Sequence, residues 1–442
     1  MKKFLFILAS IAFLKTLTAQ NYIVSTVAGN GTQGFVDGAA TTTAELYWPY
    51  GVAYDGDSVI YFTDSENHAI RKLSANTHLV TTIAGTGVLG LQNGACATAK
   101  FYNPDGIIYK NGFLYIGDNM NNCIRKIDLA NKIVSTYAGT GVAGYLDGAA
   151  NQAMFRGGNG IDIVMDKNNN IYVADGSNYC IRMISSIGQV TTFAGVAGSA
   201  GLVNGAASQA KFHRPRYLAL DTATGALYTT DINNNVIRKV LNGVVSTFAG
   251  TGVSGATDGI ATVAQFNAPV GISITVSGNF YVIDGGGNKL RKVDASGAVS
   301  TIAGNGIFGF QDGAAAAAEF YYPQGVCYDK HGFIYLADRN NNRIRKISVP
   351  ECDGCAGIEQ LSAKNQIAIY PNPSSGMVTI EVLNTTENCT YKTYNALGQE
   401  VKSGNLTQTT NQINVQELTN GVYTIVVSQK DKTSIAKIIV QK

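Results

Sequence analysis

Hydrophobic residues in this chain fall into short alternating runs that are typical of β-strands. Within residues 51–85, four such runs follow one another: GVAYD, IYFTD, AIRKL and VTTIAG. The segments between runs are rich in Gly, Asn, Asp and Ser, which favour tight turns. Glycine accounts for 50 of 442 residues and only 14% of residues are charged, a balance that suits β-structure more than helix. The pattern predicts an all-β protein.

The four runs belong to a unit that recurs six times. With small variations, each copy contains VSTxAGxG, DGA, FxxP, a short apolar run and IYxxDxxNxxIRK. Gly139, Gly141 and Gly144 spell G-x-G-x-x-G after a strand, as in a dinucleotide site, but a motif that returns in copy after copy indicates a structural turn. Four short strands in each repeat predict the blade of a β-propeller.

The two ends of the repeat region predict how the ring closes. The first copy is preceded by a lone strand pattern, YIVSTVAG, at residues 22–29, and the last copy ends at IRKISV without such a strand. We expect residues 22–29 to complete the sixth blade beside residues 343–349, so that no sheet edge stays open between the first and last blades. The count predicts a six-bladed β-propeller over residues 20–349.

The repeat resembles the NHL repeat, whose mark is an inner strand followed by YVAD and an N-H-x-I turn and strand. Asn67 and His68, followed by Ile70 and Arg71, match this phrase best. The resemblance implies the six-bladed propeller fold. It implies little about function, because such propellers include lyases, lactonases, and protein or RNA binders.

The composition changes after Pro350. Residues 350–365 form a linker that contains Cys and Gly, and residues 366–442 contain short alternating strands broken by Pro, Gly and Asn. This C-terminal part resembles the type A sorting domain of proteins exported by the type IX secretion system of Bacteroidota. The matching residues are Pro371-Asn372-Pro373, Gly376, Asn395 to Gly398, and Gly421-Val422-Tyr423. The resemblance implies a small immunoglobulin-like β-sandwich that the export machinery binds; the alternative is a generic carbohydrate- or protein-binding sandwich.

The N-terminus has the pattern of a signal peptide. Lys2 and Lys3 precede the apolar run FLFILASIAFL, and a small-residue cleavage point follows Ala19. No later run approaches the ~18 apolar residues of a membrane helix. The net charge is +3 without a basic block, so composition offers no argument for a nucleic-acid partner. We expect a mature chain without a membrane span, at the outer-membrane surface or outside the cell after periplasmic transit.

Seven cysteines are an odd number, so at least one of them is unpaired. Cys123 and Cys180 occupy equivalent places in successive copies, which should lie too far apart for a disulfide. Cys352 and Cys355 form C-x-x-C, without the second pair or histidines that zinc would need. A local disulfide between Cys352 and Cys355 is the expectation in an oxidising compartment.

Two charged residues return in every copy and are assigned to the blade itself. The aspartates follow the IYxx strand, and the arginines belong to IRK. They are Asp64, Asp118, Asp175, Asp231, Asp284 and Asp338, with Arg71, Arg125, Arg182, Arg238, Arg291 and Arg345. We expect each carboxylate to accept N–H groups of its own hairpin, and each arginine to pair with turn carboxylates or carbonyls.

Candidate ligand-binding residues are sought where the copies disagree at an accessible position. The stretch before each inner strand, which leads onto one face of the central channel, is such a place. It contributes Trp48, Tyr50, Tyr102, Asp105, Arg156, Asn159, His213, Arg214, Arg216, Tyr321, Tyr322 and Gln324. Aromatic rings beside Arg and Asn suit a sugar, a peptide or an anionic group. The alternative is that many of these rings pack between blades.

One position within the channel stands out. Two residues after the place of the inner-strand glycine, the copies carry Ala53, Ile108, Asp162, Ala219, Ser273 and Cys327. Asp162 is the one carboxylate of this ring. With Asn159 and Asp105 it would offer oxygen ligands to calcium, or it would act as an acid or base with a raised pKa.

The residues favour a non-enzymatic binding module for a glycan or protein ligand. Of four histidines only His213 lies near the variable stretch, and no nucleophile elbow or H-E-x-x-H appears. No catalytic residue and no cofactor is therefore assigned. The alternatives are a channel-centred, calcium-dependent hydrolase or lyase of the six-bladed type, and a structural adhesion protein without a defined small ligand.

Overall fold

The computed structural model describes residues 22–329, 332–348, 367–370, 376–382, 389–395, 399–408, 410–429 and 432–440. The chain divides into two compact units, Met1–Ala356 and Gly357–Lys442. The predicted signal peptide, the linker and the Cys352–Cys355 pair lie outside the described residues and stay predictions.

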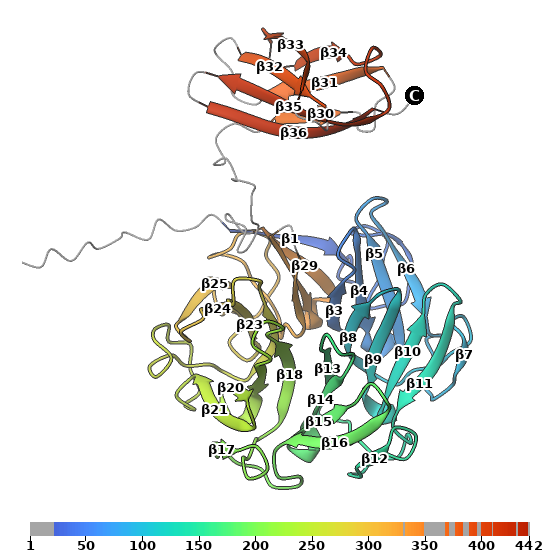
Figure 1. Cartoon of the computed structure of the whole chain (residues 1–442), viewed down its shortest axis with the longest axis vertical. Coiled ribbons are helices and arrows are strands. Elements are labelled where there is room, and N and C mark those ends of the chain that lie inside the picture. The colour runs from blue at the N-terminus through green and yellow to red at the C-terminus, as the bar shows by residue number, and fades with distance from the viewer. Residues whose placement is uncertain are drawn as a thin grey trace, which may run out of the picture. The chain divides into compact units, whose positions relative to one another are not determined.

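Six antiparallel sheets follow one another in the first unit and form the blades of a propeller (Figure 1). Blade 1 consists of β2 (Gly38–Ala39), β3 (Pro49–Tyr54), β4 (Val59–Asp64), β5 (Ala69–Ser74) and β6 (Leu79–Ala84). Blade 2 consists of β7 (Gly94–Ala95), β8 (Pro104–Lys110), β9 (Phe113–Asp118), β10 (Cys123–Asp128) and β11 (Ile133–Ala138). Blade 3 consists of β12 (Gly148–Ala149), β13 (Ile161–Met165), β14 (Ile171–Asp175), β15 (Cys180–Ile184) and β16 (Gln189–Ala194).

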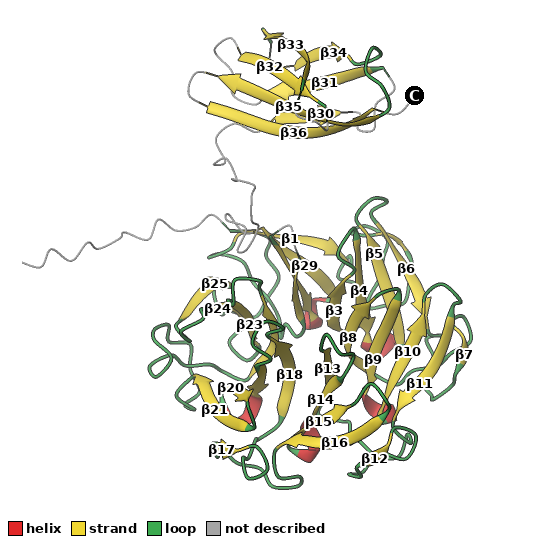
Figure 2. Ribbon diagram, in the orientation of Figure 1, coloured by secondary structure: helices red, strands yellow, loops and turns green. Residues whose placement is uncertain are grey.

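The other three blades repeat this plan. Blade 4 consists of β17 (Gly205–Ala206), β18 (Pro215–Leu220), β19 (Leu227–Asp231), β20 (Val236–Leu241) and β21 (Val244–Ala249). Blade 5 consists of β22 (Pro269–Ile274), β23 (Phe280–Asp284), β24 (Lys289–Val293) and β25 (Val299–Ala303). Blade 6 consists of β1 (Ile23–Ala28), β26 (Gly313–Ala314), β27 (Val326–Tyr328), β28 (Phe333–Asp338) and β29 (Arg343–Ser348). Short 3-10 helices, red in Figure 2, follow the second main strand: η1 (Ser65–Asn67), η2 (Asn119–Asn121), η3 (Gly176–Asn178), η4 (Ile232–Asn234) and η5 (Arg339–Asn341).

The ring closes as the sequence predicts. Strand β1 pairs antiparallel with β29, with Val24 opposite Ile347, and its other edge pairs with β26. The inner strands β3, β8, β13, β18, β22 and β27 each contact the next, and β27 contacts β3. The first and last parts of the repeat region thus share one blade (Figure 1).

Successive blades are joined by buried apolar side chains. Phe101, from the FxxP segment before blade 2, is fully buried in one cluster with Ile70 and Ala84 of blade 1. Phe155, Phe212, Phe266 and Phe320 hold the corresponding places and are also fully buried. The first copy carries Leu46 at this place, also fully buried. Burying one such apolar side chain contributes about 2–3 kcal/mol, which explains why every copy keeps a large apolar residue there.

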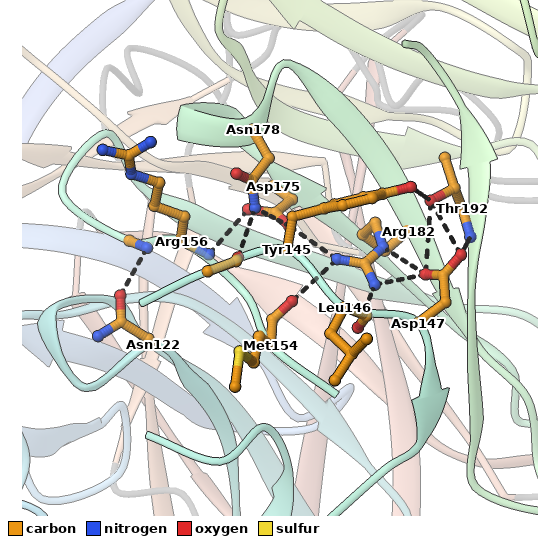
Figure 3. Close-up of polar contacts among 12 residues, drawn as sticks. Asn122, Tyr145, Leu146, Asp147, Met154, Arg156, Asp175, Asn178, Arg182 and Thr192 are labelled. Carbon is orange, nitrogen blue, oxygen red and sulfur yellow. Dashed lines mark hydrogen bonds and ion pairs between the residues drawn. The ribbon is translucent and has the colours of Figure 1, made fainter. Parts of the chain in front are cut away.

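Each blade also contains one fully buried ion pair, shown for blade 3 in Figure 3. Arg182 Nη1 lies 3.0 Å from Asp175 Oδ2, and both side chains are inaccessible to solvent. Nη1 also donates to the carbonyl of Met154, and Nη2 donates to the carbonyl of Leu146 and to Asp147. The same pair recurs as Asp64–Arg71, Asp118–Arg125, Asp231–Arg238, Asp284–Arg291 and Asp338–Arg345. The prediction for the arginines is confirmed.

The prediction for the aspartates is wrong in one respect. The carboxylate of Asp64 makes no cap of the 3-10 turn that follows it. Its Oδ1 instead accepts the N–H of Tyr47, in the segment before the inner strand, and its Oδ2 accepts from Asn67 Nδ2. The carboxylate therefore ties the middle of the blade to the start of its inner strand, because the pairing of β3 with β4 places Pro49 opposite Asp64 and brings Tyr47 close to it.

The second unit is a small β-sandwich. One sheet contains β30 (Ile367–Tyr370), β31 (Met377–Val382) and β34 (Thr410–Asn414); the other contains β33 (Glu400–Leu406), β32 (Cys389–Tyr394), β35 (Gly421–Gln429) and β36 (Lys432–Val440). Alternating residues such as Val378, Ile380, Tyr391 and Ile425 share one buried cluster. Two antiparallel sheets around a common core are what the alternating pattern of this region predicts.

Candidate binding face

The segments that start the inner strands are held by hydrogen bonds from their main-chain N–H groups to side chains of the preceding blade. The turn residue that ends each 3-10 helix is left-handed, as at Asn342 with φ 51°. Asn342 Oδ1 accepts the N–H of Trp48 at 3.1 Å, which links blade 6 to blade 1. Asn122, Asn235 and Asn288 accept in the same way from the next blade, and His68 Nδ1 does so toward Asn103.

Trp48, Asn103, Arg214, Ala268 and Tyr322, which precede the prolines, share the left-handed conformation. The main chain of these segments is thus fixed by the framework while the side chains differ from blade to blade. We call the surface around the starts of the inner strands the junction face. Variation on a fixed main chain is the arrangement expected of a recognition surface.

The junction face contains a small polar cavity of about 80 Å³. It is lined by Tyr50, Ser65, Asn103, Asp105, Asn119, Gly158, Arg214 and Arg216. Four of these, Tyr50, Asp105, Arg214 and Arg216, are among the candidates taken from the sequence. They come from blades 1, 2 and 4, so only the closed ring brings them together.

A buried ion pair forms one wall of this cavity. Arg216 Nη2 lies 3.0 Å from Asp105 Oδ2, with both side chains almost inaccessible. The hydroxyl of Tyr217 donates to Asp105 Oδ1 at 2.9 Å. Burial raises the pKa of Asp105, and the charge of Arg216 opposes that shift. The guanidinium of Arg216 also lies 5.5 Å from the ring centroid of Tyr50.

Arg339, which is not among the candidates taken from the sequence, lies beside the same cavity. Its guanidinium carbon is 3.7 Å from the ring centroid of Trp48 and 5.1 Å from that of Tyr50. Arg339 directly follows the blade aspartate Asp338, where the other copies carry Ser, Asn, Gly, Ile and Gly. This position varies as strongly as the chosen stretch, so the same criterion would have identified it.

Other candidates on the junction face pack against neighbouring aromatic rings. Tyr102 meets His68 edge-on at 5.6 Å, and His213 meets Tyr179 at 5.9 Å. Tyr321 lies 5.8 Å from Tyr322. These contacts match the alternative that some of the aromatics serve packing.

The remaining candidates do not line the polar cavity. Gln324 is buried and donates to the carbonyl of Tyr322. Arg156 is exposed, and Figure 3 shows its guanidinium pointing away from the Asp175–Arg182 pair. Asn159 is partly exposed and lines neither this cavity nor the channel cavity described next.

Asp162 lines a different cavity, which occupies the channel toward the ends of the inner strands. This cavity has a volume of about 510 Å³ and is lined by the whole predicted ring: Ala53, Ile108, Asp162, Ala219, Ser273 and Cys327. Asp162 Oδ2 accepts the N–H of Leu218 at 2.8 Å. Burial raises the pKa of Asp162 to about 8, and the nearby charge of Asp105 adds to the shift.

The geometry does not favour calcium at Asp162, Asn159 and Asp105. The two oxygens of Asp105 already face Arg216 and Tyr217, and a guanidinium beside a carboxylate repels a second cation. Within the part of the chain that the structure describes, no group of three or more His, Cys, Asp or Glu could hold a metal ion.

Cys123 and Cys180 are buried and unlinked, as predicted.

Two family models match this chain. The one described as "Secretion system C-terminal sorting domain" matches residues 368–441, and the one described as "NHL repeat" matches residues 320–347. No helix among the described residues is long and apolar enough to cross a membrane.

Curated relatives match over the repeat region. "Protein SUPPRESSOR OF QUENCHING 1, chloroplastic" of Arabidopsis thaliana is 26% identical over 324 residues, which cover 70% of this chain and 31% of that protein. "NHL repeat-containing protein 2" of Homo sapiens is 25% identical over 321 residues, covering 65% of this chain and 44% of that protein. The chain thus spans less than half the length of these relatives.

Solved structures of similar fold come from Bacteroides. A protein of unknown function from Bacteroides thetaiotaomicron superposes with a TM-score of 0.59 at 23% identity, covering 75% of this chain and 76% of that one. An auxiliary nutrient binding protein from the same organism superposes with a TM-score of 0.58 at 16% identity, covering 75% and 77%. At these identities the likeness concerns the fold alone.

Proposed function

We propose that this chain, an NHL-repeat propeller protein with a secretion-system C-terminal sorting domain, is a non-enzymatic binding protein that recognises a glycan or protein ligand through its junction face. The sorting domain implies secretion across the outer membrane, to the cell surface or the medium. The proposal concerns what the propeller does there.

One observation carries the proposal: the main chain of the junction face is held alike from blade to blade while its side chains differ. The main-chain N–H of Tyr47 donates to Asp64, and the main-chain N–H of Arg156 donates in the same way to Asp175. The side chains at these two equivalent positions nevertheless differ, because one is a tyrosine and the other is an exposed arginine. A framework that saturates its own polar groups leaves the variable side chains available for a ligand. A neighbour of the same fold is named an auxiliary nutrient binding protein, so the fold is compatible with this role.

A glycan and peptide array probed with the full mature chain tests the proposal. Trp48→Ala should abolish the strongest signal, because Trp48 lies on the junction face beside the polar cavity. Leu89→Ala is the control, since Leu89 is 52% exposed and lies in the segment between β6 and β7. Ligands that bind both variants alike, or no ligand at all, would refute recognition through this face.

A second candidate is a channel-centred hydrolase or lyase, and one observation favours it. Asp162 lines the channel cavity and has a pKa of about 8, which would let its carboxyl serve as an acid near neutral pH. The calcium-dependent form of this candidate is disfavoured by the Asp105–Arg216 pair. An activity screen that is positive for the natural chain and negative for Asp162→Asn would establish it in place of the binding role.

A further inference from the structure

The polar cavity of the junction face holds more positive than negative charge. Arg216 and Asp105 neutralise one another. Arg214 lines the same cavity, but within the described residues it forms no ion pair, and its buried Nε has no hydrogen-bond partner. Arg339, beside the cavity, likewise has a buried Nε without a partner and no ion pair among the residues described.

Glu66 does not balance this excess. Its Oε1 accepts from Asn103 Nδ2 at 2.5 Å, and it forms no ion pair within the described residues. Three guanidiniums, Arg214, Arg216 and Arg339, thus lie at or beside the cavity with two carboxylates, Asp105 and Glu66. The next carboxylate near Arg216 is Asp162, which lines the channel cavity. Burial lowers the pKa of Arg214 and the charge of Arg216 adds to this shift, while the charge of Asp105 opposes it. Arg214 is half-buried, and a half-buried cation without an ion-pair partner in the chain is stabilised by an anion bound beside it.

The cavity also offers hydrogen-bonding groups of both kinds. Asn119 Oδ1 accepts from the N–H groups of Gly158 and Gly160, which leaves its Nδ2 as a donor. The hydroxyl of Ser65 donates to the carbonyl of Pro104, which leaves its oxygen as an acceptor. The cavity has a volume of about 80 Å³ and polar groups line it, so it suits a small charged group such as a carboxylate.

We infer that this cavity binds the carboxylate of an acidic sugar, such as a uronate residue of a glycan. The carboxylate of the sugar pairs with the guanidinium of Arg214. The hydroxyl groups of the sugar donate hydrogen bonds to Asp105 and Ser65. The sugar ring lies outside the polar cavity, on the side of Trp48 and Tyr50. The inference rests on the proposed function, because it names the ligand class of the same face.

The test measures binding of the full mature chain to polygalacturonate, alginate and hyaluronan by calorimetry. Methyl-esterified polygalacturonate, a neutral dextran and poly-glutamate serve as comparison probes. At least one uronate should bind, the methyl ester should bind at least about tenfold more weakly, and affinity should fall with added salt. Arg214→Gln should lose about tenfold in affinity, because a charge-assisted hydrogen bond is removed.

Lys167→Gln is the matched control, since it removes an exposed positive charge in the loop between β13 and β14. Equal binding of the acid and its ester, equal binding by Arg214→Gln and the natural chain, or no binding of any uronate would overturn the inference. Poly-glutamate that binds as tightly as the uronates would replace the acidic sugar with an acidic peptide. An array ligand lost in Trp48→Ala but kept in Arg214→Gln would leave the proposed function standing without this inference.

Discussion

Replacing Arg182 with methionine removes one guanidinium from a buried pair while keeping an unbranched, apolar side chain. Arg182 contacts Asp175, Asp147 and the carbonyls of Leu146 and Met154 (Figure 3). Asp175 would stay fully buried, held only by Asn178 and the N–H of Arg156. Removing one partner of a buried pair typically destabilises by about 3–5 kcal/mol. This is a large share of the roughly 5–15 kcal/mol that stabilises a folded protein.

The loss should depend on pH in a definite direction. Burial already raises the pKa of Asp175 to about 6 in the natural chain, although Arg182 opposes the shift. Without Arg182 the pKa of Asp175 rises further, so at low pH the carboxyl of the folded variant is neutral and its burial costs little. At high pH the folded variant must either bury an unpaired charge or keep the carboxyl protonated, and both cost free energy. Folding of the variant is therefore favoured at low pH and is weakened as pH rises through the folded pKa. The free-energy loss should be smaller at pH 5 than at pH 8.

Urea unfolding of the full chain at both pH values, followed by tryptophan and far-UV signals, measures the effect. The double variant Arg182→Met with Asp175→Asn should recover part of the loss at pH 8, since no buried charge remains. Lys167→Gln provides a control for loss of a surface charge. A loss under about 1 kcal/mol, or an equal loss at both pH values, would refute the reasoning that this pair holds the blade together.

Three further predictions follow from closure, the channel and export. Deleting residues 22–29 removes β1 from between β29 and β26 and exposes both edges, so it should cause aggregation and a large fall in Tm; a Tm within about two degrees of the parent would contradict the closure. For Asp162, the folded pKa of about 8 exceeds the unfolded value, so its stabilising contribution is present below about pH 4 and is lost as pH rises toward 8. Relative to Asp162→Asn, the natural chain should lose up to about 1.4 kcal/mol per pH unit in that window in denaturant titrations; parallel profiles would refute the assignment. Deleting residues 366–442 should leave a folded propeller in the periplasm of a host with this secretion system, because the two units are separately compact; normal amounts in the medium by immunoblot would show that these residues are not the sorting signal.

The local features of the fold could be predicted from the sequence because the same strand and turn pattern occurs in six copies. The alternation in IYFTD and AIRKL, with turn residues between them, predicts paired strands, and the pairing of β4 with β5 confirms it. The lone strand pattern at residues 22–29, and the absence of a VSTxAG phrase after IRKISV, predict the shared sixth blade, and the pairing of β1 with β29 confirms it. These inferences depend only on strand periodicity and on the need to satisfy sheet edges.

The polar contacts of the blades were only partly accessible. Asp64 followed by Asn67 has the pattern of a local turn, and Asn67 does contact that carboxylate. The second oxygen instead reaches Tyr47, 17 residues earlier, because the inner strand returns beside the second strand only in the folded blade. A turn pattern predicts hydrogen bonds between residues that are close in the sequence. It does not predict a hydrogen bond to a residue that strand pairing places nearby.

The candidate site was decided by tertiary structure. Tyr217 and Asp105 are separated by 112 residues, and Arg339 and Trp48 belong to the last and first blades, yet each pair is in contact. Copy-to-copy variation identified the stretch from which Tyr50, Asp105, Arg214 and Arg216 come. Which of these side chains share a cavity depends on the closure of six blades around one channel and on the side-chain rotamers within it. A sequence of repeats specifies the blade, but the positions of side chains from different blades relative to one another are determined only when the ring is closed.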